Sequence, residues 1–274
     1  MNTLPPATAH TQYTRTAPPR GRAARVLRRL REPLVSCAVF ALAIVLWEIA
    51  VRVSGTPDYA LPAPSLIVSA ADWSGVLDAA RDTVGSVLAG FAVGNAAGLL
   101  LALLISASPL LSAVLYPLAL TVRAVPVVAL APFITLVAGR GATPTVVVAA
   151  LIVFFPTLVN VLLGLRSVER EALELMHVLN CRAGTVYWRV RLPAAMPAFF
   201  DSLRIAAPSA VLGVMTAEWL IGGDGLGKLV ISTALSQDTA TMWGAILASS
   251  VVAGLVYAAV TLAERRLLPW AVRR

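Results

Sequence analysis

The chain has 274 residues, of which 58% are hydrophobic and only 13% are charged, whereas an average soluble domain has about 25% charged residues. This balance excludes an ordinary soluble domain and indicates an integral membrane protein. The formal net charge of +8 does not indicate nucleic-acid binding, because the arginines lie in tails and loops beside apolar stretches, where the positive-inside rule explains them.

The first 33 residues are rich in Thr, Pro, Ala and Arg and have no apolar periodicity. We expect residues 1–33 to form a disordered basic cytoplasmic tail near anionic lipid headgroups, followed by one transmembrane domain over residues 34–274. The run Leu34–Cys37 resembles a lipoprotein cleavage box. However, the apolar run begins at this box and continues through a full span, so the first helix is interpreted as an uncleaved anchor.

Several apolar stretches reach the roughly 20 residues needed to cross the hydrocarbon core of a bilayer. They predict an all-α, polytopic membrane protein with about six transmembrane helices. The third stretch is too long for one upright helix and contains Pro117, Pro126 and Pro132, which predicts a kinked or broken helix. The predicted spans are Leu34 to Val51, Val84 to Ile105, Leu110 to Val137, Thr145 to Leu165, Pro197 to Leu220 and Met242 to Leu262.

Glycines recur every fourth residue in the second predicted span, at Gly90, Gly94 and Gly98. A helix face without side chains allows a neighbouring helix to approach closely. The face could pack inside the domain or between two copies of the chain, and ordinary internal packing is the favoured interpretation.

Polar side chains inside apolar stretches must find a partner or line a wet cavity. Five residues meet this description: Asn95, Arg123, Asn160, Arg204 and Glu218. Asp201 stands three residues before Arg204, a spacing that predicts a structural ion pair on one helix face.

A charged island between the fourth and fifth predicted spans, about residues 166–193, is the most informative part of the sequence. Helical character on both sides of Asn180 predicts two arms joined by a turn, because asparagine tolerates the left-handed region better than most residues. Leu192-Pro193 is expected to stop the helix and close the loop. The sequence contains no catalytic set and no metal-ligand set, and its two cysteines lie far apart.

The island resembles the EAA loop of ATP-binding-cassette (ABC) importer permeases, the loop that couples the permease to its ATPase. Glu174 and the closing residues Val190, Leu192 and Pro193 fit that pattern. Leu175 and Met176 stand where the family usually has alanines, and Asn180 stands where it usually has glycine.

The resemblance extends over about Leu61 to Trp270 and is to permeases that import nitrate, sulfonate or taurine. It implies the type I importer permease fold, with two cytoplasmic ATP-binding subunits, an extracytoplasmic solute-binding protein and a second permease copy, most simply a homodimer. ATP and Mg would be bound by the ATPase, so the resemblance implies no cofactor and no enzymatic activity for this chain. The matching pieces are Leu61–Ser65, Arg123–Pro126, Phe154–Thr157, Leu203-Arg204, Ala217-Glu218 and Gly225–Gly227.

Arginine counting predicts the orientation of the spans. Seven arginines in the first 31 residues, five from Arg166 to Arg191 and four from Arg265 onward would share one side, against Arg52, Arg81, Arg140 and Lys228 opposite. Both termini and the loop are therefore expected to be cytoplasmic in a bacterial inner membrane.

Within the importer interpretation, Arg123, Asn160 and Glu218 are candidates for lining the translocation pathway. Arg123 and Arg204 would suit an anion, so a sulfonate, taurine or nitrate-like substrate is slightly favoured over a thiamine-precursor pyrimidine or riboflavin. Two rivals from other classes are a secondary carrier and a membrane scaffold that does not transport. The charged loop argues against a carrier, which would need no ATPase.

Overall fold

A computed structural model describes residues 22–123, 126–139 and 141–270, and every regular element in these ranges is helical. The chain divides into two units, residues 1–54 and 55–274. The first unit contains α1 (Arg22–Ser54), which includes the first predicted span. Residues 22–33 were expected to be disordered, and this is wrong, because α1 begins at Arg22; their Arg, Ala and Leu are strong helix formers. The rest of the predicted tail, residues 1–21, lies outside the described residues.

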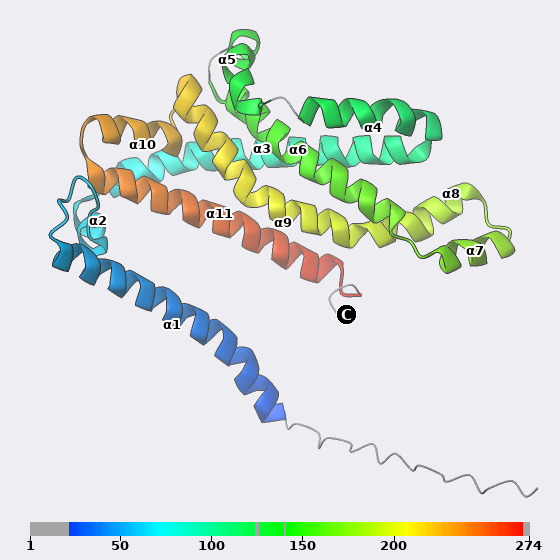
Figure 1. Ribbon diagram of the computed structural model, residues 1–274, viewed down its shortest axis with the longest axis horizontal. Coiled ribbons are helices and arrows are strands. Elements are labelled where there is room, and N and C mark those ends of the chain that lie inside the picture. Colours follow the sequence, from blue (N-terminus) through cyan, green and yellow to red (C-terminus); the bar gives the residue numbers. More distant parts are fainter. Residues whose placement is uncertain (1–21, 124–125, 140, 271–274) are drawn as a thin grey trace, which may run out of the picture. The chain divides into compact units, whose positions relative to one another are not determined.

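The second unit is a bundle of helices joined by short connections (Figure 1). Two of its segments are π-helical turns, η1 and η2, which lie directly before and after α9. The elements of this unit are α2 (Pro64–Ala70), α3 (Trp73–Ala107), α4 (Pro109–Arg123), α5 (Val127–Ala138), α6 (Ala142–Arg166), α7 (Arg170–Val178), α8 (Ala183–Val186), η1 (Tyr187–Arg191), α9 (Leu192–Ala217), η2 (Glu218–Gly222), α10 (Leu226–Leu235) and α11 (Thr239–Leu267).

Among the described residues, four helical stretches are long and apolar enough to cross a membrane: α3, α6, the continuous stretch Ala183–Gly222, and α11. They contain four of the predicted spans. The third predicted span forms two helices, α4 and α5, with Pro126 at the N-cap of α5. This agrees with the prediction of a broken helix, because proline lacks the N–H that a helix interior requires.

Helices α3, α6 and α9 form the centre of the second unit, where Val87, Ala149, Val153, Ala206 and Val214 are fully buried. Gly90, Gly94 and Gly98 of α3 face α6. A Cβ added to Gly90 would lie 2.5 Å from the Cβ of Ala149, and one added to Gly94 would lie 2.3 Å from the carbonyl oxygen of Ala150.

At Gly98 the added Cβ would lie 2.7 Å from the carbonyl oxygen of Phe154. The structure therefore places all three glycines in a contact within one chain. The backbones of α3 and α6 approach too closely for any side chain at these positions.

A buried polar pair joins the same two helices. The Thr157 hydroxyl donates a 2.5 Å hydrogen bond to Oδ1 of Asn95, and Nδ2 of Asn95 donates to the Phe91 carbonyl at 2.6 Å. Asn95 is thus satisfied inside the bundle. Sequence reasoning singled out Asn95 but gave no partner for it.

The first turns of α3 and α11 are capped by aspartates and joined to each other. Asp72 accepts from the Gly75 amide at 3.2 Å, and its own N–H donates to the Thr241 hydroxyl at 3.0 Å. Hydrogen bonds from the Ser74 hydroxyl and from the Gly75 amide lower the pKa of the Asp72 carboxyl. Asp238 caps α11 through the Thr241 amide at 3.1 Å.

The glycine contact gives a direct test of the packing. We expect Gly94→Ala to lower the stability of the purified protein in detergent by about 1–3 kcal/mol, the usual cost of overpacking, seen as a lower midpoint of thermal unfolding. Gly85→Ala is the matched control, because Gly85 is on the same helix and nothing lies within 4 Å of its added Cβ. Equal midpoints for the two variants would contradict the close approach of α3 and α6.

Candidate functional site: the loop between α6 and α9

The charged loop leaves the bundle at the end of α6 and returns through α8 and η1 into α9 (Figure 1). Its outward arm is α7. The return arm has no break before the span, because α8, η1, α9 and η2 form one helical stretch of 40 residues, Ala183–Gly222. At about 1.5 Å per residue, this stretch is about twice as long as a membrane core requires.

Asn180 makes the turn between the two arms. Its φ of +52° lies in the left-handed region, as the sequence predicts. The Asn180 amide donates to the His177 carbonyl at 2.9 Å, and the Cys181 amide donates to the Met176 carbonyl at 3.0 Å. These two bonds form a Schellman motif, in which the C′ position is usually glycine and sometimes asparagine. Asn180 therefore replaces the glycine of the family pattern with the geometry kept.

Helix α7 exposes apolar side chains to solvent. None of its residues is buried. Leu175 and Val178 are 55% and 80% exposed, and the C-cap residue Leu179 is 60% exposed. Its charged positions include Glu174, which accepts from Arg170 at 3.0 Å in an exposed ion pair. An apolar row on a helix with no buried face indicates a surface that another protein covers.

Leu192-Pro193 does not stop the helix, and that part of the prediction is wrong. Leu192 has helical dihedrals, and its amide bonds to the carbonyl of Tyr187, five residues earlier. This π turn is wider than an α turn and accommodates Pro193, which has no amide to donate and whose ring would crowd an ordinary turn. Val190 lies within the π turn, so the closing residues of the family pattern form part of a continuous helix.

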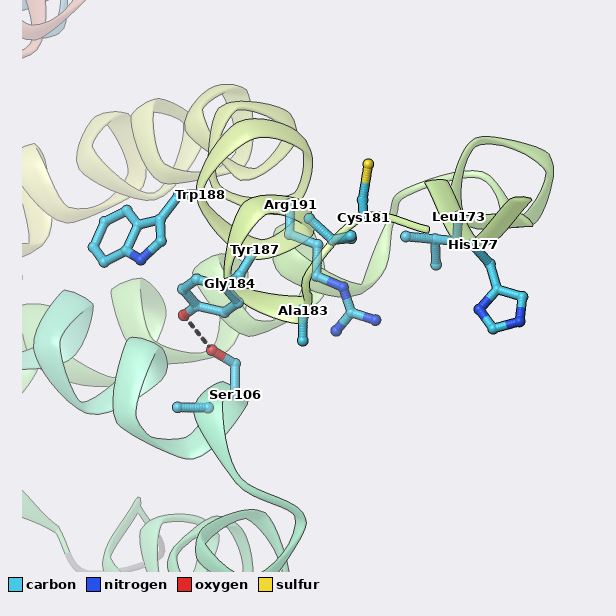
Figure 2. A pocket seen from close by; sticks show the side chains of 11 residues that line it. Ser106, Leu173, His177, Cys181, Ala183, Gly184, Tyr187, Trp188 and Arg191 are labelled. Carbon is cyan, nitrogen blue, oxygen red and sulfur yellow. Dashed lines mark hydrogen bonds between the residues drawn. The ribbon is translucent and has the colours of Figure 1, made fainter. Parts of the chain in front are cut away.

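A pocket of about 580 Å³ lies beside the return arm (Figure 2). Tyr187 and Ser106 both line it, and their hydroxyls form a 2.6 Å hydrogen bond (Figure 2). The Tyr187 hydroxyl also lies 3.3 Å from the Leu103 carbonyl. These contacts attach the return arm to the end of α3. The larger side chains that also line the pocket include those of Leu173, His177, Cys181, Trp188 and Arg191.

Of the three candidate pathway residues, the structure describes the side chains of Asn160 and Glu218, and these two bond to different partners. Asn160 is half-buried and donates to the Pro156 carbonyl of its own helix at 2.8 Å. Glu218 is enclosed, with 3% exposure, and is bonded to Thr83 and to the Gly227 amide. The side chain of Arg123 lies outside the described part of the chain.

The structure contains the ion pair between Arg204 and Asp201, and it adds a second partner for the arginine. Arg204 also pairs with Glu264 of α11, which is 8% exposed. One guanidinium therefore lies between two carboxylates and joins α9 to α11. Sequence spacing reveals only the partner on the same helix, because Glu264 is 60 residues away.

Comparison with known proteins assigns most of the second unit to one family. Residues 94–269 match the family described as binding-protein-dependent transport system inner membrane component. The formylaminopyrimidine transport permease protein of Halalkalibacterium halodurans is 32% identical, and the alignment covers 89% of this chain and 98% of that protein.

Two further relatives differ in how much of the chain they match. The riboflavin transport system permease protein of Chloroflexus aurantiacus is 32% identical, with 90% of this chain and 94% of that protein covered. The taurine transport system permease protein of Escherichia coli is 29% identical, with 68% and 64% covered.

The fold also resembles a solved transporter. A chain of the MetNI methionine ABC transporter, in a structure of inward-facing conformations, superposes with a TM-score of 0.52 at 17% identity. The superposition covers 74% of this chain and 98% of that one. The helical fold is therefore that of a type I importer permease.

The turn at Asn180 can be tested by substitution. Asn180→Gly should keep the loop intact, whereas Asn180→Val should destabilise the turn by about 1–2 kcal/mol, since a β-branched residue is strained at positive φ. The measurement is hydrogen exchange of the Asn180 and Cys181 amides in detergent. Equal protection in both variants would show that the turn does not need its left-handed residue.

Proposed function

The chain belongs to the family of binding-protein-dependent transport system inner membrane components, and on that premise we propose how it couples ATP to import and what it carries. It is a membrane permease subunit of an ABC importer. Secondary carriers and non-transporting scaffolds are set aside by this membership.

The coupling proposal rests on the exposed apolar row of α7 and on the helical stretch Ala183–Gly222, which begins in the same loop and continues into the membrane. We assign the loop of residues 166–193 as the surface that a cytoplasmic ATP-binding subunit covers. Leu175 and Met176, larger than the usual alanines, would shape that contact for a particular ATPase. When two such subunits close on ATP and Mg, α7 would be displaced, and the continuous stretch Ala183–Gly222 would carry the displacement into the bundle.

The assembly that fits this role has two permease copies, most simply identical, two ATP-binding subunits and an extracytoplasmic solute-binding protein. The loop and both termini face the cytoplasm in this proposal, in keeping with the arginine distribution. ATP hydrolysis belongs to the partner subunits.

For the substrate, we favour a neutral heteroaromatic compound of the pyrimidine or flavin class over a sulfonate, taurine or nitrate-like anion. The pyrimidine and riboflavin relatives match about nine-tenths of this chain, and the taurine relative about two-thirds. The structure adds a physical reason. Arg204, one of the two arginines that suggested an anion, is already paired with two carboxylates, so it offers no free positive charge.

Charge reversal at Glu174 tests the coupling surface. Glu174→Arg should lower ATP-driven uptake at least tenfold while the spans stay folded, because the side chain is exposed and its ion pair with Arg170 contributes less than about 1 kcal/mol. Asp78→Arg is the matched control, because Asp78 is also an exposed carboxylate paired with an arginine of its own helix, Arg81, but lies outside residues 166–193. Unchanged uptake with Glu174→Arg would remove this residue from the coupling surface.

Uptake by cells that express the chain with its ATPase and binding protein tests the substrate class. We expect saturable uptake of a radiolabelled pyrimidine or riboflavin that a hundredfold excess of taurine does not inhibit. Saturable taurine or nitrate uptake, without competition from the heteroaromatic compounds, would establish the anion alternative.

A further inference from the structure

A buried carboxylate occupies the far end of the helix that begins in the coupling loop. Glu218 lies in η2 and is 3% exposed, and Thr83 of α3, its neighbour, is fully buried. The Thr83 hydroxyl lies 3.0 Å and 3.1 Å from the two carboxylate oxygens and donates to them. The Gly227 amide donates to the same carboxylate at 2.9 Å.

The hydrogen bonds continue into the first turn of α10. The Leu226 amide donates to the Thr83 hydroxyl at 2.8 Å, so both of the first two amides of α10 have buried side-chain acceptors. These amides have no partner within their own helix, and a carboxylate near them is favoured by the helix dipole. Glu218, Thr83 and α10 therefore form one closed polar group, which we call the Glu218 link.

Two glycines allow this approach. A Cβ on Gly225 would lie 2.1 Å from Oε1 of Glu218, and a Cβ on Gly227 would lie 2.2 Å from the Met215 carbonyl oxygen. No side chain fits at either position without displacing the carboxylate or the backbone of α9.

The covalent connection between η2 and α10 is short and rich in glycine, running Gly222-Gly223-Asp224-Gly225. Gly222 has a φ of +77°, and nothing lies within 4 Å of the position of its Cβ. Glycine has the greatest backbone freedom of any residue, so this connection alone transmits motion poorly. The Glu218 link bypasses it and ties η2 directly to α10 and α3.

Helix α10 is also packed by apolar contacts. Leu226 is fully buried in a cluster with Val76 and Ala79 of α3 and Ala245 of α11. The cluster joins α10 to α3 and α11, whereas the hydrogen bonds of the Glu218 link join it to the long helix.

We propose that Glu218 and Thr83 are positioning residues that make α10 move together with the helix Ala183–Gly222, so that displacement of the coupling loop reaches the opposite end of the bundle. This inference rests on the proposed function for its transport readout. It replaces the sequence-based assignment of Glu218 to the pathway lining, because the carboxylate is enclosed and all its described partners belong to the fold.

The test uses the complex reconstituted in liposomes with its ATPase and binding protein. Thr83→Val keeps the shape of the side chain but removes the hydroxyl, and we expect the ATP hydrolysed per solute imported to rise at least tenfold. Thr83→Ser restores the hydroxyl and should return the ratio to within twofold of wild type. Thr216→Val is the matched control, since the Thr216 hydroxyl bonds within its own helix, to the Leu212 carbonyl at 2.7 Å.

A distance measurement between α9 and α10 tests the Glu218 link and requires no transport activity. Spin labels at Leu212→Cys on α9 and Ser232→Cys on α10, in a background without native cysteines, should give one narrow distance distribution. Adding Thr83→Val or Glu218→Gln should broaden it, and Thr83→Ser should not. Both labelled positions are exposed.

The outcomes are distinguishable. If the wild-type complex shows no ATP-driven uptake, the proposed function fails, while the spin-label distances still decide whether the link holds α10. If uptake and hydrolysis fall in proportion in both Thr83→Val and Glu218→Gln, or if the ratio and the distances stay unchanged, the inference is overturned.

Discussion

Close backbone contact between α3 and α6 is the constraint on which the rest of the second unit depends. In a bilayer the hydrophobic effect does not drive helices together, since lipid tails are as apolar as leucine. Association relies on van der Waals contact between helices, and small residues increase this contact because they let the two backbones approach closely. Gly90, Gly94 and Gly98 provide this contact on one side of α6.

The other side of α6 uses the same device against α9. Gly164 faces Ala195 and Ala198, and Gly213 of α9 faces Ile152. Helix α9, which continues the return arm of the proposed coupling loop, is therefore held close to α6. A displacement of the loop therefore acts on the tightly packed helices α3, α6 and α9. Tightly packed helices transmit motion because there is little free volume between them in which side chains could shift.

Much of this architecture could be read from the sequence, and the omissions have physical causes. Hydropathy and the glycine period predict the spans and the packing face, because both are local patterns that a bilayer enforces on every segment. Pro126 predicts the break between α4 and α5, because proline lacks the N–H that a helix interior requires. The cross-helix partners could not be predicted, because each lies on another helix at a sequence distance that no periodicity encodes. They are Thr157 for Asn95, Glu264 for Arg204 and Thr83 for Glu218. The continuation of the helix through Pro193 was missed because a π turn leaves no signature in a single sequence.

The two π turns position the side chains that attach the long helix to α3. Such turns are uncommon and often occur at functional sites, because they widen the helix and release carbonyls from the regular ladder. Here η1 holds Tyr187 against Ser106 within the proposed coupling loop, and η2 holds Glu218 against Thr83 at the other end. Each turn thus presents a polar side chain to α3. In a regular α-helix of the same sequence, that side chain would point in a different direction around the helix axis. The helix Ala183–Gly222 is attached to α3 at both ends through side chains and to α6 in between through small residues. A force applied at α7 therefore acts on a helix whose attachments are defined along its whole length, which is the arrangement that a coupling element requires.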